Sequence, residues 1–147
     1  MISARDIVGA WALRRFSIQT DGRPELFPFG EDAQGMLTYT ESGHMSAILS
    51  RRGRPLLGVG RLENAGRATE KQRAEAFSSY LSYAGTWRVE DDRVVHTVTL
   101  SLSPDAVGKE NIRHARLHRD QLTLSYEIVP LSGRRRAYTL CWERLRP

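Results

Sequence analysis

The sequence predicts an all-β protein, an antiparallel barrel of eight strands with one helix between the third and fourth strands. Apolar and polar residues alternate in short runs along most of the 147 residues, which is the pattern of strands buried on one face. Turn sequences rich in glycine, serine and aspartate separate these runs, as in a meander of neighbouring antiparallel strands. Eight strands are enough to close a small barrel whose interior can hold one ligand.

The predicted strands follow one another through turns of recognisable chemistry. Ser3 is a typical helix N-cap and predicts a short helical turn before the first strand. Tight hairpin connections are expected at residues 41–43, at residues 91–92 and around Asp120. The predicted strands comprise residues 9–18, 35–40, 44–50, 83–90, 93–102, 111–119, 121–129 and 135–145.

The stretch "TEKQRAEAFSSYLSY" interrupts the β pattern. Thr69 and Gln72 have the spacing of a capping box, which marks the start of a helix. Ala74, Phe77 and Leu81 follow at helical spacing and form a narrow apolar stripe. We therefore expect one helix between the third and fourth strands, laid over a barrel opening or against the side of the barrel.

Composition places limits on the class of protein. Arginine and lysine together number 22 against 17 acidic residues, for a net charge of +5, and a basic balance is one feature of nucleic-acid binders. However, the basic residues are scattered apart from residues 51–54 and 133–136, which lie beside turn residues where charge is usually solvated. Aromatic residues are not interleaved with them, so we do not expect a nucleic-acid partner.

The chain is expected to be one cytoplasmic domain spanning residues 1–147. No run of residues is long and apolar enough for a membrane helix, and the first residues lack the pattern of an export signal. The one cysteine, Cys141, has no partner for an internal disulfide, which fits a reducing compartment. We expect no membrane association and a monomer or homodimer.

Alternation also assigns one face of each strand to the barrel interior, although a slip of one residue would reverse a strand completely. The predicted inward residues are Trp11, Leu13, Leu37, Tyr39, Met45, Ala47, Leu49, Tyr83, Trp87, Val89, Val94, His96, Val98, Leu100, Arg113, Ala115, Leu117, Leu122, Leu124, Tyr126, Tyr138, Leu140 and Trp142.

Polar members of this set are the candidates for chemistry. His96 lies on the apolar side of its strand, where it is either a core histidine bonded to a tyrosine or a proton donor and acceptor near neutral pH. A buried Arg113 needs a carboxylate, a carbonyl or a ligand anion. The alternatives are an ion pair with Glu127 or Glu110, a register slip that places Arg113 in solvent, and a ligand. We predict catalytic roles for His96, Arg113 and Tyr83. The predicted ligand-binding residues are Tyr39, Met45, Trp87, Leu100, Tyr126, Tyr138 and Trp142.

Metal and cofactor chemistry have little support in the sequence. His114 and His118 are four residues apart, but on a strand this spacing separates them by roughly 13 Å, too far to share an ion. Glycine-rich segments lack the strand-to-helix context of a phosphate loop. We therefore expect no metal and no cofactor.

Two Gly-x-Trp triplets, at residues 9–11 and 85–87, each open a strand. Trp11 shares a face with Leu13, so its indole is expected to plug the barrel floor near the N-terminal helical turn. Arg144, close to the end of the chain, could then cover the ring by a cation–π contact.

Four stretches, "GAWALRRF", "FPFGEDAQGMLTYTESGHMSAIL", "YLSYAGTWRVEDDRVVHTVTLSLSP" and "RLHRDQLTLSY", together resemble the bacterial and fungal lipocalin-like domain family. Residues 28–46 are the most specific part. The resemblance implies a small antiparallel barrel of the calycin type, in a family where some members look like tailoring proteins of natural-product pathways. Secreted lipocalins usually carry a signal peptide and a disulfide, and the sequence shows neither, so secreted transport is not expected.

Two functions follow from these observations. The first is a barrel that binds a small hydrophobic or partly polar molecule, such as a natural-product intermediate. The second is a cofactor-independent isomerase or cyclase that holds a polyketide- or terpenoid-like substrate in the same cavity, where His96, Arg113 and a tyrosine move protons or stabilise an enolate.

Overall fold

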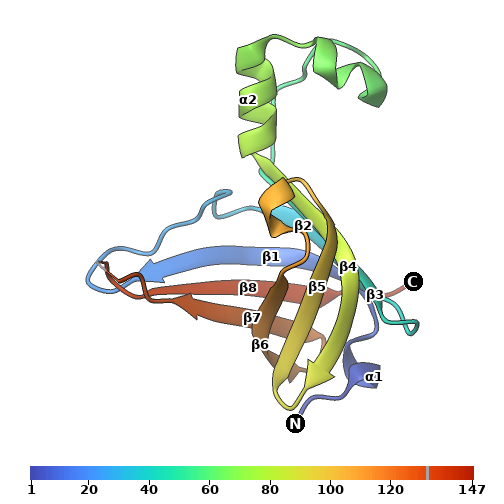
Figure 1. Cartoon of the computed structure of the whole chain (residues 1–147), viewed down its shortest axis with the longest axis vertical. Coiled ribbons are helices and arrows are strands. Elements are labelled where there is room, and N and C mark those ends of the chain that lie inside the picture. The colour runs from blue at the N-terminus through green and yellow to red at the C-terminus, as the bar shows by residue number, and fades with distance from the viewer. Residues whose placement is uncertain (132) are drawn as a thin grey trace.

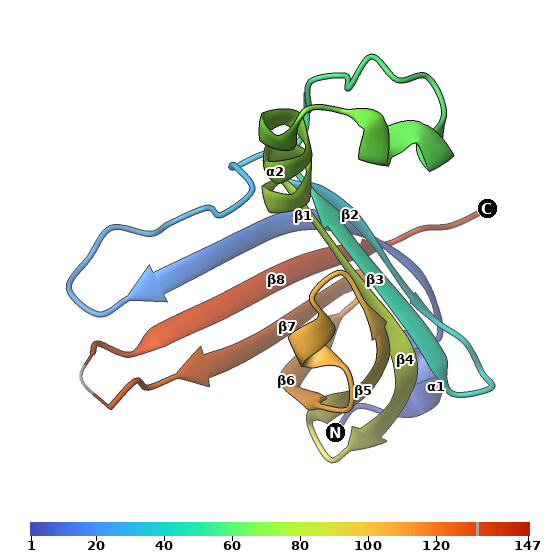
Figure 2. The same ribbon diagram turned by 45° about the horizontal axis from the view of Figure 1, so that its top comes forward.

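A computed structural model describes residues 1–131 and 133–147. Within these residues, eight strands form a closed barrel in which each strand is antiparallel to its neighbour in sequence and the last pairs with the first (Figures 1 and 2). The predicted eight-stranded antiparallel barrel is therefore confirmed. Its elements are α1 (Ala4–Ile7), β1 (Gly9–Thr20), β2 (Gln34–Tyr39), β3 (His44–Ser50), η1 (Leu62–Arg67), α2 (Glu70–Ser78), β4 (Tyr80–Glu90), β5 (Arg93–Ser101), η2 (Pro104–Ala106), β6 (Glu110–His118), β7 (Gln121–Ile128) and β8 (Arg136–Arg144).

Helix α1 closes the barrel floor. The indole of Trp11 is fully buried and donates a hydrogen bond from Nε1 to the carbonyl of Ile7 at 2.9 Å. The guanidinium of Arg144 lies 4.2 Å from the centre of the Trp11 ring and donates hydrogen bonds to the carbonyls of Val8 and Asp6. The predicted floor, with an indole plug and an arginine over it, is confirmed.

A register shift in β1 changes which side chains point inward. Leu13 lies opposite Trp142 of β8, but Arg15 is the next residue to find a partner, so Arg14 is an extra residue in β1. Such a bulge reverses the alternation beyond it. Both adjacent arginines are therefore exposed, and Phe16, which the predicted inward set omitted, is buried with only 8 % of its surface accessible.

A second shift, between β4 and β5, corrects the prediction for Leu100. Gly85 lies opposite Val98 and Ala84 lies opposite Leu100, so Thr99 is the extra residue. Leu100 consequently faces outward with 69 % of its surface exposed and is not an interior residue. A Cβ atom on Gly85 would lie 1.8 Å from the carbonyl oxygen of Thr97, so the two strands approach closely because residue 85 is glycine.

Helix α2 begins as predicted but does not cover the barrel. Thr69 caps it, accepting a hydrogen bond from the Gln72 backbone at 3.2 Å. Its described residues are not buried, Phe77 is 55 % exposed, and Leu81 belongs to β4 instead of the helical stripe. Figures 1 and 2 show α2 and η1 standing away from the barrel beyond β3 and β4. The predicted packing was wrong because the stripe shrinks to two side chains once Leu81 is removed.

Residues 51–79 are called the arm below. Among the residues that the structure describes, no helix, in the arm or elsewhere, is long and apolar enough to cross a membrane.

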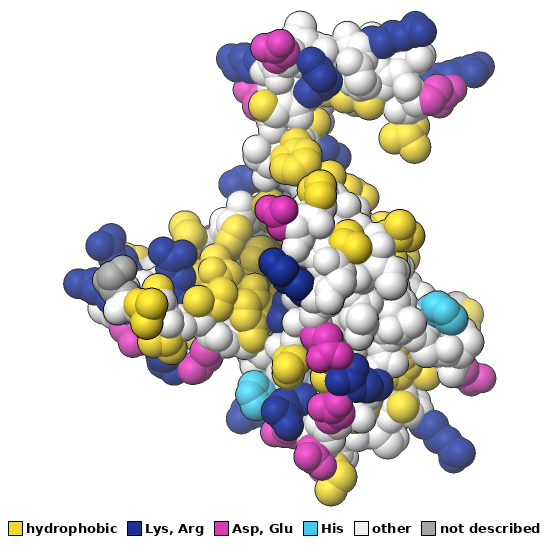
Figure 3. Space-filling view, viewed as in Figure 1, with side chains coloured by type: hydrophobic (Ala, Val, Ile, Leu, Met, Phe, Trp, Pro, Cys, Tyr) yellow, Lys and Arg dark blue, Asp and Glu magenta, His cyan; other side chains and the backbone are white. Residues whose placement is uncertain are grey.

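Three strands extend beyond the others at one end of the barrel. β2 pairs with residues 9–12 of β1, whereas β8 pairs with β1 as far as Thr20, and β7 continues beside β8 to Ile128. This three-strand extension projects sideways in Figure 1. Figure 3 shows hydrophobic side chains gathered over β1 and β8 where the extension leaves the barrel.

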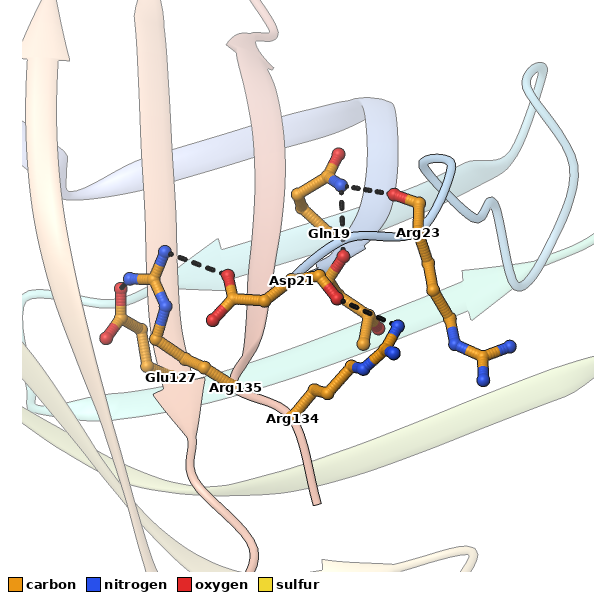
Figure 4. A network of polar contacts seen from close by, with 7 residues as sticks. Gln19, Asp21, Arg23, Glu127, Arg134 and Arg135 are labelled. Carbon is orange, nitrogen blue, oxygen red and sulfur yellow. Dashed lines mark hydrogen bonds and ion pairs between the residues drawn. The ribbon is translucent and has the colours of Figure 1, made fainter.

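The tip of the extension carries an arginine-rich turn whose charges are partly paired. Arg135 donates to Glu127 at 2.5 Å and to Asp21 at 3.5 Å, and Arg134 donates to the Asp21 carbonyl at 3.4 Å (Figure 4). These contacts join the turn after β1 to the turn before β8. The expectation of a merely solvated arginine cluster is therefore corrected for two of its arginines, although their side chains remain at the surface.

Candidate functional site

A cavity of about 110 Å³ lies inside the barrel. Most of its wall is aliphatic or aromatic, and Tyr83 of β4, His96 of β5 and Arg113 of β6 bring polar groups from three neighbouring strands. An apolar cavity with a few placed polar groups is typical of a small-molecule site. The lining residues are Phe16, Leu37, Ala47, Leu49, Leu81, Tyr83, His96, Arg113, Leu124, Tyr126, Leu140 and Trp142.

His96 joins two tyrosines within the core. It lies opposite Trp87 of β4 in the sheet, and only 1 % of its surface is exposed. The hydroxyl of Tyr39 is 2.7 Å from Nε2, and the hydroxyl of Tyr83 is 2.8 Å from Nδ1. The prediction that His96 faces the interior within hydrogen-bond reach of a tyrosine is confirmed.

Burial keeps the His96 ring neutral. It lowers the pKa of the ring from 6.5 to about 3, and the nearby positive charge of Arg113 acts in the same direction. Burial also raises the pKa of the Tyr39 and Tyr83 hydroxyls, so both phenols keep their protons at neutral pH. A neutral imidazole has one donor and one acceptor, so one tyrosine donates to the ring and the other accepts from it.

Arg113 does not form either of the ion pairs expected from the sequence. Glu127 pairs with Arg135, and Glu110 pairs with Arg88 at 2.9 Å. Both acidic side chains lie on the outer face of the barrel, whereas Arg113 faces the cavity, which is why they cannot meet.

The guanidinium of Arg113 lies instead over an aromatic ring. Its Cζ atom is 3.8 Å from the centre of the Tyr126 ring, and Nη1 donates to the carbonyl of Ile112 at 3.1 Å. Tyr126 in turn stacks on Tyr138, with ring centres 4.5 Å apart and planes 10° apart. This cation–π contact neutralises no charge, so the guanidinium carries its full positive charge beside the cavity.

Trp142 of β8 adds an N–H donor among the residues that line the cavity. The residue is 2 % exposed, and its buried Nε1 atom has no hydrogen-bond partner among the described residues. A buried donor without an acceptor costs roughly 1–3 kcal/mol, so such groups are rare and call for an explanation.

The predicted site residues divide according to their distance from the cavity. Tyr39, Met45 and Trp87 are buried in the adjoining core, where the Tyr39 and Trp87 rings are 4.6 Å apart, but they do not line the cavity. Tyr138 lies behind Tyr126, and Leu100 lies on the outer face. The predicted site residues that line the cavity are Tyr83, His96, Arg113, Tyr126 and Trp142.

Sequence reasoning missed two wall residues, Phe16 and Leu81. Phe16 was missed because the bulge at Arg14 reverses the face of β1, and two adjacent arginines within an otherwise alternating strand were the available sign of it. Leu81 was assigned to the helix, although the alternation of Leu81 with Tyr83 fits the start of β4 equally well. Both residues contribute apolar wall to the cavity.

A wider hollow of about 630 Å³ lies against the three-strand extension. Its charged groups are Arg23, Arg134 and Arg136, and all three are exposed. Exposed guanidinium groups are satisfied by water, so they give no reason to expect a ligand. The smaller cavity, where His96 is buried and Tyr83 and Arg113 are half-buried, is the better candidate.

No metal ligands can be named within residues 1–131 and 133–147. His114 lies 3.8 Å from the Asp92 carboxylate at the surface, but no group of three or more His, Cys, Asp or Glu side chains is arranged around a common point in this part of the chain.

The chain matches a known protein family. The sequence profile of the lipocalin-like domain matches residues 8–145, from the residue before β1 to the one after β8. Neither the curated proteins nor the solved structures contain a significant match to the chain.

Proposed function

Because the chain belongs to the lipocalin-like domain family, we propose that it binds a small, mostly hydrophobic molecule with one polar end inside the barrel. The main support is the cavity of about 110 Å³, in which nine aliphatic or aromatic lining residues surround Tyr83, His96 and Arg113. An apolar cavity of about 150 Å³ holds benzene in another protein. The buried part of the ligand is therefore about one ring or a short chain, such as the end of a natural-product intermediate.

Filling the cavity tests this proposal. Ala47 is 2 % exposed and lines the cavity, so Ala47→Leu places extra carbon atoms where the ligand would lie. Ala12 is the matched control, because it lies on the outer face between Met36 and Glu143. Overpacking a core costs about 1–3 kcal/mol, so circular dichroism must first show that each variant is folded.

Binding would be measured by NMR titration with benzoate, benzamide, indole and octanoate. We expect at least one compound to shift the indole signals of the wild-type protein and of Ala12→Leu but not those of Ala47→Leu. The proposal fails if none of the compounds binds, or if Ala47→Leu binds as well as Ala12→Leu.

The second candidate is a cofactor-independent isomerase or cyclase that acts on a polyketide- or terpenoid-like substrate in this cavity. Its support is the position of Tyr83 and Arg113 on one wall, where their N–H and O–H groups would stabilise an enolate oxygen as charge develops there. His96 would link the Tyr83 hydroxyl to that of Tyr39 as protons move.

An enolisable ketone distinguishes the two candidates. A solvent base takes a proton from the carbon beside the carbonyl, the electron pair of that C–H bond passes to the oxygen as an enolate that Tyr83 and Arg113 stabilise, and a deuteron from solvent then bonds to the carbon. With phenylacetone in deuterated buffer, an enzyme should speed this exchange, and Tyr83→Phe or His96→Phe should reduce the acceleration by ~10² to 10⁴. If phenylacetone binds and its exchange rate equals that in buffer alone, the barrel acts on this ligand class only as a binder.

A further inference from the structure

The hydrogen bonds of the Tyr39–His96–Tyr83 chain have a defined direction. Tyr39 is 1 % exposed, and among the described residues its hydroxyl has one partner, the Nε2 atom of His96. If Tyr39 accepted from that nitrogen, its own proton would be buried without an acceptor, at a cost of roughly 1–3 kcal/mol. Tyr39 therefore donates to Nε2, and the ring proton lies on Nδ1 and is donated to Tyr83.

This direction leaves the hydroxyl proton of Tyr83 free. The oxygen of Tyr83 accepts from Nδ1 of His96 at 2.8 Å, so its own proton has to point elsewhere. Tyr83 also lines the cavity. The proton on the Tyr83 oxygen is therefore available to a ligand in the cavity.

Arg113 brings further donors to the same wall. A guanidinium has five N–H groups, and one of them is used on the Ile112 carbonyl. Arg113 has no acidic partner among the ion pairs of the described residues, and its flat face is covered by Tyr126. Its edge is thus the part available to a ligand, and planar donors in this arrangement match the two oxygens of a carboxylate.

The cavity therefore has more donors than acceptors. Tyr83 offers one O–H group, Arg113 offers several N–H groups, and Trp142 has a buried N–H group without a partner in the described part of the chain. Both ring nitrogens of His96 are engaged by tyrosines, so among the other lining side chains only the Tyr126 hydroxyl can accept a hydrogen bond.

We propose that the cavity selects ligands with an anionic oxygen group, a carboxylate or an enolate, held between the Tyr83 hydroxyl and the Arg113 guanidinium. His96 acts as a positioning residue that directs the Tyr83 proton to the ligand. This inference rests on the proposed function, because it names the ligand class of the same cavity.

Benzoate and benzamide test the inference, since they share shape and differ in charge. We expect the wild-type protein to bind benzoate more tightly, and Arg113→Met and Tyr83→Phe each to weaken benzoate by roughly 10- to 100-fold, as for hydrogen bonds to a charged group. Benzamide affinity should change much less in Arg113→Met. Arg14→Gln is the matched control, because Arg14 is an exposed arginine paired with Glu143 on the outer face.

The outcomes separate the inference from the proposed function. If benzamide binds as tightly as benzoate, and Arg113→Met weakens both equally or neither, the cavity binds ligands but the anion preference is refuted. If neither compound nor any other probe binds, both proposals fail together.

The role of His96 has its own measurement. Long-range proton–nitrogen NMR spectra distinguish the two neutral forms of a histidine ring, and we expect the proton on Nδ1 at pH 7. His96→Phe should then lower the preference for benzoate over benzamide about tenfold while Tyr83 and Arg113 remain in place. A proton on Nε2, or an unchanged preference in a folded His96→Phe protein, would overturn the positioning role.

Discussion

Arg144 at the barrel floor and Arg113 at the cavity both lie over an aromatic ring, at 4.2 Å from Trp11 and 3.8 Å from Tyr126. The two guanidinium groups differ in the acceptors that their N–H groups reach. Arg144 donates to two backbone carbonyls and lies 3.7 Å from the Asp120 carboxylate, whereas Arg113 reaches one carbonyl. A guanidinium whose donors are satisfied within the chain stabilises the fold. One that keeps its donors beside a cavity is available to a ligand.

Removing Arg144 should have the largest effect on stability. Arg144→Ala leaves the carbonyls of Asp6 and Val8 without their donor and uncovers the Trp11 ring. We expect the free energy of unfolding to fall by about 2–3 kcal/mol, measured by urea denaturation. Arg14→Gln, which breaks an exposed ion pair, should cost less than about 1 kcal/mol. Equal losses in the two variants would show that the floor contacts contribute no more than a surface pair.

Lowering the pH should reduce the free energy of unfolding, because His96 is a buried neutral base. Its pKa is about 3 in the folded protein and 6.5 in the unfolded chain. Between these values the unfolded chain takes up a proton that the folded protein does not, so falling pH favours unfolding. The stability due to His96 is therefore present above pH 6.5 and decreases by about 1.4 kcal/mol per pH unit below it, or roughly 2 kcal/mol at pH 5.

The measurement is the difference in unfolding free energy between the wild type and His96→Phe at pH 7, 6 and 5, because the other titrating groups are common to both proteins. The wild type should lose stability faster than the variant as the pH falls. Parallel curves would contradict a neutral buried ring.

Changing Arg113 should separate stability from binding. Arg113→Met replaces a cation over Tyr126 by an apolar chain of similar length, and a cation–π contact is worth about 0.5–1 kcal/mol at such a site. We expect the free energy of unfolding to change by about 1 kcal/mol or less, with benzoate binding reduced as described above. A loss as large as that in Arg144→Ala would remove the distinction between the two arginines.

The arginines at the tip of the extension should have the smallest effect. Replacing Arg134, Arg135 and Arg136 together by Gln removes surface pairs with Asp21 and Glu127, and exposed pairs contribute little. Stability should change by about 0.5 kcal/mol, and benzoate affinity should not change, as measured by denaturation and NMR titration. A large, steeply salt-dependent loss of binding to a nucleic-acid oligomer would instead restore a polyanion as the partner.

Sequence alone predicted the barrel because its strands alternate with a period of two, and alternation reports burial directly. The assignment of inward and outward faces failed where a strand contains one extra residue, a bulge. The bulges at Arg14 and Thr99 reversed the faces of Phe16 and Leu100, and both depend on how two strands fit together, which one strand does not encode. Gly85 was a visible clue, because a residue without a side chain lets the neighbouring strand approach closely.

The candidate site was predicted in part for the same reason. His96 was identified from its place among valines, since that pattern is local. The partner of Arg113 was not identified, because Tyr126 and Glu127 are neighbours in sequence but lie on opposite faces of β7. The capping of α2 by Thr69 was likewise predictable from local spacing, whereas its lack of packing was not.

The arm of residues 51–79 leaves and re-enters the barrel at a single point, because Ser50 of β3 lies opposite Tyr80 of β4. Its two ends are thus about one strand spacing apart, roughly 5 Å. In topological terms the arm is an insertion into a hairpin, and closing a longer loop adds only about 0.6 kcal/mol for each doubling of its length. The barrel can therefore accept a short turn, a foreign domain or new chain termini at this point.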